Sequence, residues 1–181
     1  MRIKQSRSAG FTLVELLITL AIASILLSVA SPSFSRFLQS NQIKSHSNSL
    51  ISSLYLARSE AVKRGVNITM RHVGSTDNNW EEGWQIFTDV DGNELFNDDG
   101  DSTLCESNED CLLHVQAALP DGVSLRSNFP QQVVYKSIGS LTGLGGTFTV
   151  CSHGADLTSA RKIIITITGR PRTEVGAQKC A

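Results

Sequence analysis

The 181-residue sequence lacks the patterns on which most enzyme and metal sites depend. It has no short Cys-x-x-Cys pair, and its histidines (His46, His72, His114 and His153) show neither triad nor metal-ligand spacing. The glycine-rich stretch GSLTGLGGTF is not followed by the Lys-Ser/Thr pair of a phosphate-binding loop. We therefore predict that the chain is not an enzyme and that it needs no metal or cofactor.

Charge is almost absent from one long segment near the N-terminus. Residues 11–32 are a run whose only charged member is Glu15, and about 20 apolar residues are enough to cross a bilayer as a helix. Three bases and no acid precede the run, so this end is expected to stay cytoplasmic. A cleaved secretory signal is disfavoured because the run is long and no clean small-x-small site follows it. A plain membrane anchor is disfavoured because an unpaired carboxylate there costs about 2.5–3.5 kcal/mol.

The segment GFTLVELLITLAIASILL resembles the processing site and N-terminal helix of type IV prepilins and type II secretion pseudopilins. The resemblance implies that a prepilin peptidase cuts after Gly10 and that the new N-terminal residue, Phe11, is methylated. It further implies that Glu15 pairs with the N-terminal amine of a neighbouring subunit. The implied partners are major and minor pilins. The implied location is the inner membrane before assembly, with a single span and a periplasm-facing domain, and then a cell-surface pilus.

The rest of the chain suggests one long helix followed by short strands. We expect a cleaved leader at residues 1–10, a transmembrane or filament-core helix at 11–32, its amphipathic continuation at 33–65, and a β-rich domain at 66–181. The continuation has apolar residues at three- and four-residue steps and ends at Gly65. Strand-like stretches follow: VNITMRHV, GWQIFTDV, CLLHVQA, GVSLRS, QVVYKS, GTFTVCS and KIIITIT. These elements indicate an α+β fold with one long helix packed on antiparallel sheet.

Four stretches within these elements narrow the resemblance. LARSEAVKRG, WEEGWQIFTDVDGN, TFTVCSHG and ARKIIITITGRPR resemble the GspH/FimT family of minor pilins and pseudopilins, in which FimU-like proteins are relatives. The resemblance implies the type IV pilin fold. It leaves open three functions: a DNA-uptake minor pilin, a minor pilin that primes pilus assembly without touching DNA, and an H-type secretion pseudopilin.

The four cysteines are expected to form two disulfides because the domain is translocated. Three pairings are possible. We favour Cys105–Cys111 with Cys151–Cys180, since each closes a local unit. We expect the second bond to hold the loop that contains Arg170 and Arg172 against the sheet. A zinc site is the alternative, and the absence of a short Cys-x-x-Cys pair counts against it.

Acidic and basic residues are separated along the domain. Residues 77–121 contain thirteen acids and no Lys or Arg, whereas residues 122–181 contain seven bases and two acids. The acidic stretch DVDGNELFNDDGD resembles a calcium loop, but Glu94 stands where that pattern needs glycine and Gly100 where it needs glutamate. We therefore interpret it as a solvated hairpin loop with no metal.

The stretch TGRPRTE separates the candidate functions. Gly169 permits a turn, and Pro171 biases its predecessor toward extended geometry, so this stretch is expected to begin a surface loop. Extended geometry places Arg170 and Arg172 on one side about 6.6 Å apart, the scale of successive backbone phosphates. Two solvated arginines in a turn are the simpler interpretation.

Some FimT-type members carry a Gly-Arg-x-Arg motif in this loop that contacts DNA during natural transformation. The resemblance assigns that role to Gly169, Arg170 and Arg172. The basic C-terminal third adds Arg161, Lys162 and Lys179 as candidate contacts to the DNA phosphate backbone. The sequence therefore predicts a FimT-like minor pilin that binds DNA without strong sequence preference and supports its uptake.

Overall fold

The computed structural model describes residues 11–98, 100, 105, 109–129, 131–154, 157–177 and 179–180. Its longest element is α1 (Leu13–Arg64), which is followed by eight short strands. Contacts divide the chain into two units, Met1–Leu38 and Gln39–Ala181, and only the second contains strands.

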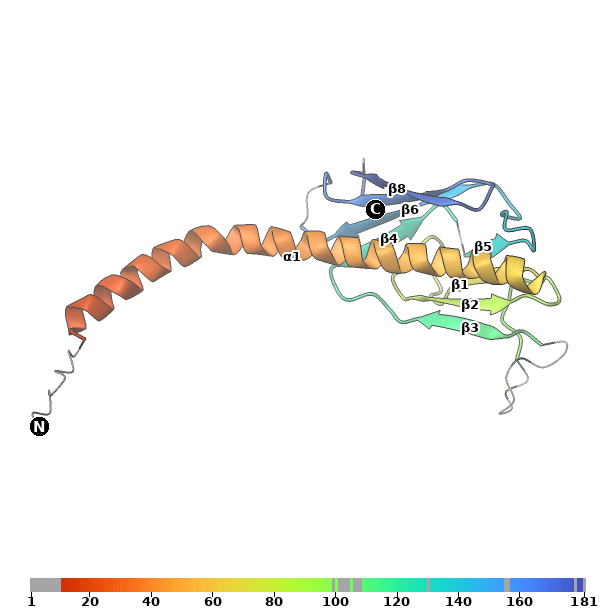
Figure 1. The fold of residues 1–181 in the computed structure, drawn as a ribbon, viewed down its shortest axis with the longest axis horizontal. Coiled ribbons are helices and arrows are strands. Elements are labelled where there is room, and N and C mark those ends of the chain that lie inside the picture. The colour runs from red at the N-terminus through yellow and green to blue at the C-terminus, as the bar shows by residue number, and fades with distance from the viewer. Residues whose placement is uncertain are drawn as a thin grey trace, which may run out of the picture. The chain divides into compact units, whose positions relative to one another are not determined.

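Within Gln39–Ala181, α1 contributes an apolar stripe to the core (Figure 1). The stripe consists of fully buried side chains spaced three, four or seven residues apart, which keeps them on one helix face: Ile43, Leu50, Leu54, Ala57 and Ala61. The helix ends in Lys63 and Arg64, whose positive charges suit the negative end of the helix dipole. Gly65 follows at φ 71°, and its amide donates to the carbonyl of Ala61. The predicted end of the helix is thus confirmed.

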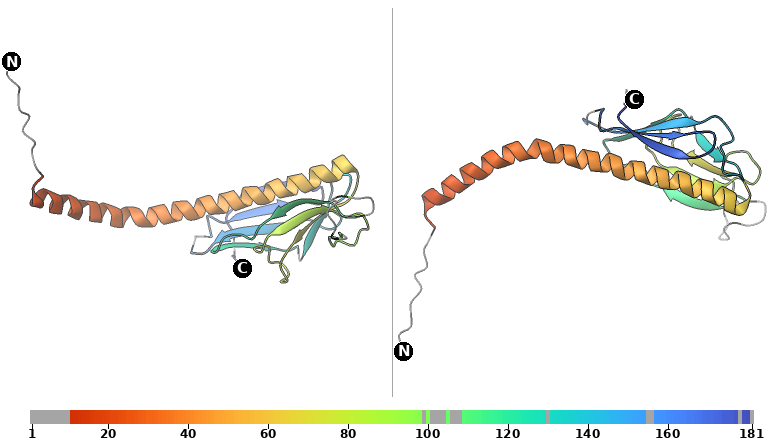
Figure 2. Two further views of the ribbon diagram at one scale, coloured as in Figure 1. Left: turned by 90° about the horizontal axis from the view of Figure 1, so that it is seen from below. Right: turned by 45° about the horizontal axis from the view of Figure 1, so that its top comes forward.

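The strands form two four-stranded antiparallel sheets. The first sheet has the order β3-β2-β1-β5 and the second β4-β6-β7-β8. Both contribute to one core with α1, and Figure 2 shows the helix running across them. Large buried side chains fill the core, among them Trp80, Trp84, Tyr135 and Phe148. The strands are β1 (Ile68–His72), β2 (Trp84–Thr88), β3 (Leu112–Gln116), β4 (Val123–Ser127), β5 (Gln132–Tyr135), β6 (Gly146–Ser152), β7 (Arg161–Ile165) and β8 (Pro171–Val175).

Seven of these strands occupy the predicted stretches, but the eighth was missed. The KIIITIT stretch ends as a strand at Ile165 rather than continuing to Thr168. The chain then turns and forms β8, so Arg172 lies in a strand and not in the expected loop. β8 is an edge strand that buries only its first residue, Pro171, and therefore shows no apolar alternation.

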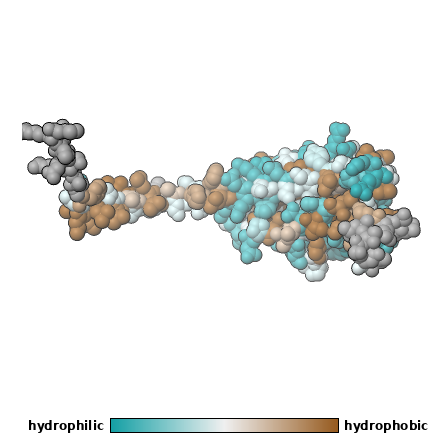
Figure 3. Space-filling view, turned by 60° about the horizontal axis from the view of Figure 1, so that its bottom comes forward, coloured by the Kyte–Doolittle hydropathy of each residue, from teal (hydrophilic) through white to brown (hydrophobic). Residues whose placement is uncertain are grey.

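The N-terminal unit is described by its helix alone. Its large apolar side chains, such as Phe11, Leu16 and Ile25, are exposed. Figure 3 shows that much of the surface of this part of α1 is hydrophobic. Among the described residues, no single helix meets the length and hydropathy required to cross a membrane. The bent pair Leu13–Ser28 and Ser33–Arg64 meets them together, by length and composition. The single inner-membrane span at residues 11–32 stays a prediction.

The first turn of α1 explains how the chain accommodates Glu15. Glu15 Oε2 accepts hydrogen bonds from the Thr12 amide at 3.0 Å and from Thr12 Oγ1 at 2.9 Å. Thr12 Oγ1 in turn accepts from the Glu15 amide at 3.2 Å. This is a capping box, with the Thr-x-x-Glu pattern legible in the sequence but not used in our prediction. The carboxylate thus has a local partner. Gly10 lies outside the described residues.

Candidate nucleic-acid interface

The predicted DNA motif lies on the hairpin that joins β7 to β8. Thr166 and Gly169 close its turn, because the Gly169 amide donates to the Thr166 carbonyl at 2.8 Å. After the turn, β8 pairs with β7 in antiparallel register, with Arg172 opposite Ile164 and Glu174 opposite Lys162. Strand pairing, rather than loop geometry, therefore holds Arg172.

Gly169 is required by its surroundings as well as by the turn. Its φ is +75°, a region that side chains rarely adopt. A Cβ atom at this position would lie 2.2 Å from the Gly139 carbonyl oxygen and 2.9 Å from Cε1 of Tyr135. The Tyr135 ring is fully buried, and burial raises the pKa of its hydroxyl well above the ordinary value. The motif glycine is thus packed against a neutral aromatic ring.

Arg170 and Arg172 are both exposed, but their partners differ. Arg172 forms an ion pair with Glu174, with 3.4 Å between Nη2 and Oε1. Both side chains are well exposed, at 64% and 49%, so solvent screening leaves this pair weak. No ion pair of Arg170 occurs among the described residues. A phosphate group can therefore compete with Glu174 for Arg172, and it can bind Arg170 without displacing an ion-pair partner among the described residues.

The other three predicted DNA contacts, Arg161, Lys162 and Lys179, lie in three different places. Ile163 and Ile165 of β7 are buried, so alternation puts Arg161 on their inner face and Lys162 on the outer face with Arg172. Lys162 is diagonal to Arg172 across the strand pair, a spacing of about 7–8 Å. Lys179 lies beyond the far end of β8, next to Cys180. The structure thus groups Arg170, Arg172 and Lys162, and does not group Arg161 or Lys179 with them.

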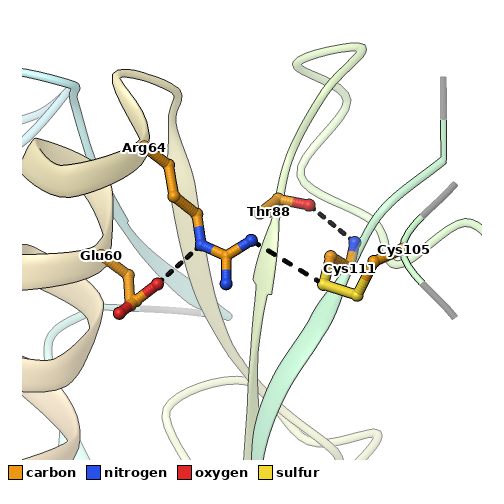
Figure 4. The surroundings of a disulfide bond; sticks show 5 residues. All are labelled: Glu60, Arg64, Thr88, Cys105 and Cys111. Carbon is orange, nitrogen blue, oxygen red and sulfur yellow. Dashed lines mark hydrogen bonds and ion pairs between the residues drawn. A yellow bond between two sulfur atoms is a disulfide. The ribbon is translucent and has the colours of Figure 1, made fainter. Parts of the chain in front are cut away.

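Both favoured disulfides are present. Cys105 is bonded to Cys111, and Arg64 at the end of α1 approaches that bond, with 4.0 Å between Nη1 and Cys111 Sγ (Figure 4). Glu60 accepts from Arg64 Nε at 2.6 Å, and the Cys111 amide donates to Thr88 Oγ1 at 2.6 Å. The disulfide therefore joins the network that connects the helix end to β2.

The second disulfide does not act as we expected from the sequence. Cys151–Cys180 was predicted to hold the loop of Arg170 and Arg172 against the sheet. Cys151 is near the end of β6, and β6 pairs antiparallel with β7, so the bond lies at the opposite end of the sheet from the Thr166–Gly169 turn. It fixes the tail after β8, and the contact with Gly139 fixes the turn.

The acidic segment after β2 brings three carboxylates together. Oxygens of Asp89, Asp91 and Asp110 lie within 4.8 Å of one another. Asp110 is buried and accepts from the amides of Val90 and Asn97, both at 2.9 Å. Buried Asp89 accepts from Thr69 Oγ1 at 3.0 Å. These hydrogen bonds show that the two buried carboxylates hold the loop in place. That the loop binds no metal stays a prediction.

The strands next to the acidic segment and those next to the basic hairpin lie on different sides of α1. In Figure 1, β2 and β3 lie on one side of α1, and β6 and β8 lie on the other. Asp89 follows β2, whereas Arg170 precedes β8. Glu94 of the acidic segment nevertheless lies beside the β5–β6 connection, because its carboxylate accepts from Gln132 and it lines one pocket with Leu141 and Thr142.

Comparison with protein-family models gives two matches. The model described as "Type II transport protein GspH" matches residues 46–169, more than half of the chain. The model described as "Prokaryotic N-terminal methylation motif" matches residues 5–31. The chain belongs to the GspH family and carries an N-terminal methylation motif. No curated protein matches it significantly.

Solved structures share the fold. The type IV minor pilin FimU of Pseudomonas aeruginosa (strain PAO1, space group P21) is 20% identical, with 80% of this chain and 99% of FimU covered and a TM-score of 0.60. The minor pseudopilin EpsH from the Type 2 Secretion System of Vibrio cholerae is 16% identical, with 74% of this chain and 97% of EpsH covered and a TM-score of 0.51. The chain thus has the type IV pilin fold, as predicted.

Proposed function

We propose that this chain is a minor pilin of a type IV pilus that binds the DNA backbone through Gly169, Arg170 and Arg172 and supports DNA uptake. The observation that carries the proposal is the exposed pair Arg170 and Arg172 beside a buried Gly169. Guanidinium groups suit phosphates because they offer a fixed fork of donors. Lys162 adds a third cation on the outer face of the sheet.

The pilus context rests on the N-terminus and the fold. The methylation motif supports processing at Gly10–Phe11 by a prepilin peptidase and anchoring in the inner membrane before assembly. The likeness to FimU supports incorporation into a pilus among major and minor pilins. After assembly the unit Gln39–Ala181 faces the cell exterior and presents the hairpin.

A secretion role is the second candidate. The description of the family model and the likeness to EpsH favour an H-type pseudopilin of type II secretion. A pseudopilin needs Glu15 and the helix but does not require exposed arginines at the β7–β8 hairpin. The same holds for a minor pilin that only primes assembly. The arginines therefore discriminate between these functions.

The test is a chromosomal Arg170→Gln, Arg172→Gln double variant in the source organism. The DNA-uptake function predicts that transformation falls to the level of the deletion strain while piliation and secretion stay at wild-type levels. Both side chains are exposed, so the substitutions should leave the fold intact, and immunoblotting of the variant checks its level. Normal transformation in the variant would refute the function. Loss of piliation or secretion on deletion, without a transformation defect in the double variant, would favour the second candidate.

A further inference from the structure

Two turns from different parts of the chain form one surface beside α1. The β5–β6 connection begins with a turn closed by the Gly139 amide, which donates to the Lys136 carbonyl at 2.7 Å. This turn touches the Thr166–Gly169 turn through Gly139 and Gly169, and the Leu141 amide donates to the Ile167 carbonyl at 2.9 Å. The position of one turn therefore fixes that of the other.

The helix holds the β5–β6 turn from its other side. Arg58 Nε donates to the Gly139 carbonyl at 2.9 Å, the same oxygen that lies against Gly169. Gly139 has φ +76°, and a Cβ atom there would lie 3.0 Å from Val62 Cγ2. The turn is thus held between α1 and the β7–β8 hairpin by contacts on both sides.

Charge on the two turns has one sign. Lys136 is exposed at the start of its turn, and Arg170 is exposed just after the other. The sequence has no acid between residues 122 and 155, and no ion pair of Lys136 occurs in the described part of the chain. By contrast, the nearby helix residues Lys63 and Arg64 are both paired with Glu60. Lys136 is therefore a cation without an ion-pair partner among the described residues, three residues before Gly139, which contacts Gly169 of the predicted DNA motif.

We propose that Lys136 is a further DNA-phosphate contact and that the two turns together form the binding surface. This inference rests on the proposed DNA-binding function and adds a residue from outside the Gly-Arg-x-Arg motif. Each phosphate contact adds about −0.9 to the slope of log K against log salt on duplex DNA. Lys136 thus extends the contact from the hairpin toward α1, across the Gly139–Gly169 junction.

The unit Gln39–Ala181 has its own core, so it serves as the test protein. Binding to a fluorescent duplex of mixed sequence is measured by anisotropy over a salt series. Lys136→Gln should weaken binding roughly five- to tenfold near 0.1 M salt and reduce the slope by about 0.9. Lys136→Arg should restore both values. Lys44→Gln is the matched control, because Lys44 is exposed 14 residues, or about 21 Å of helix, before Arg58.

The variants separate this inference from the function on which it rests. If Arg170→Gln with Arg172→Gln abolishes binding while Lys136→Gln behaves like Lys44→Gln, the inference is wrong and the function stands. If the wild-type unit does not bind the duplex, both the Lys136 inference and the proposed DNA-binding function are wrong. Circular dichroism on each variant shows whether the fold is kept, and recovery with Lys136→Arg excludes a structural cause for the loss.

Discussion

Gly169 and Gly139 meet so closely that a Cβ atom on Gly169 would lie 2.2 Å from the Gly139 carbonyl oxygen. The contact joins the β7–β8 hairpin to the β5–β6 turn, and Arg58 ties the same oxygen to α1. The position of the candidate DNA motif therefore depends on residues from three separate parts of the chain. This relationship governs both the stability and the proposed function of the hairpin.

Gly169→Ala should destabilise the domain by about 2–4 kcal/mol, because it combines an unfavourable φ with a clash against backbone. Gly92→Ala is the matched control. Gly92 has nearly the same φ, +76°, but nothing lies within 4 Å of its Cβ position, so the cost should be about 1 kcal/mol. Urea unfolding measures both values. Equal losses in the two variants would show that the Gly139 contact has no energetic consequence.

The two disulfides should differ in their contribution to stability. Cys151 and Cys180 are 29 residues apart, and Cys105 and Cys111 are 6 apart. By the loop-entropy relation, removing the first bond should cost about 3–4 kcal/mol and removing the second about 2 kcal/mol. Serine pairs at each site and chemical unfolding test this order. Peptide mapping without reduction checks the connectivity, and recovery of a Cys105–Cys180 link would contradict it.

His72 should make the domain less stable in mild acid. Burial lowers the pKa of His72, and Arg71 lowers it further, while Asp77 and Glu82 act in the opposite direction. The unfolded chain, with a pKa of about 6.5, therefore binds a proton more readily than the folded one. The stabilising contribution is complete above about pH 6.5 and decreases as the pH falls through the lower folded-state pKa.

The measurement is the free energy of unfolding against pH, in a His46→Gln background because burial also lowers the pKa of His46. Adding His72→Gln should flatten the acid side of the profile. An unchanged slope after that substitution would assign the acid sensitivity to other groups.

Glu15 should matter for assembly and not for processing. Mass spectrometry of membrane-derived protein should show Phe11 at the N-terminus, methylated, and a chain that starts at Met1 would contradict the pilin assignment. Glu15→Ala should be cleaved normally but fail to enter filaments, since it removes the carboxylate for which the resemblance implies an amine partner. Thr12→Ala is the control: it disrupts the same capping box but keeps the carboxylate. Equal assembly defects in both variants would assign the effect to the helix start.

Much of the fold was predictable because apolar residues repeat at helical or strand spacing. The stripe from Leu50 to Ala61 and the alternation in β4, β5 and β7 come from side chains that must face one core. β8 escaped prediction because an edge strand need not alternate, and its pairing depends on the register with β7. Its PRTEV sequence carries a proline and two charges, which are typical of protected sheet edges.

The candidate site was predictable in composition but not in arrangement. The motif Gly169-Arg170-x-Arg172 is legible in the sequence, and the turn at Gly169 follows from its conformational freedom. The pairing of Arg172 with Glu174 follows from the extended geometry of β8, a strand that was not predicted, whereas the packing of Gly139 on Gly169 depends on tertiary structure. No local pattern marks Lys136 as a neighbour of the hairpin, because the two turns are far apart in the sequence.

The central claim is that the hairpin binds DNA through its arginines, and the most direct measurement is the affinity of Gln39–Ala181 for a mixed-sequence duplex. We expect roughly micromolar binding with a salt slope of about −2 to −4, because two to four phosphates are contacted. Glu174→Gln should strengthen binding by freeing Arg172. Lys44→Glu lowers the net charge by two, as the double arginine variant does, and should leave binding nearly unchanged. Arg170→Gln with Arg172→Gln should abolish most binding at unchanged thermal stability. Undiminished binding by that double variant would contradict the account.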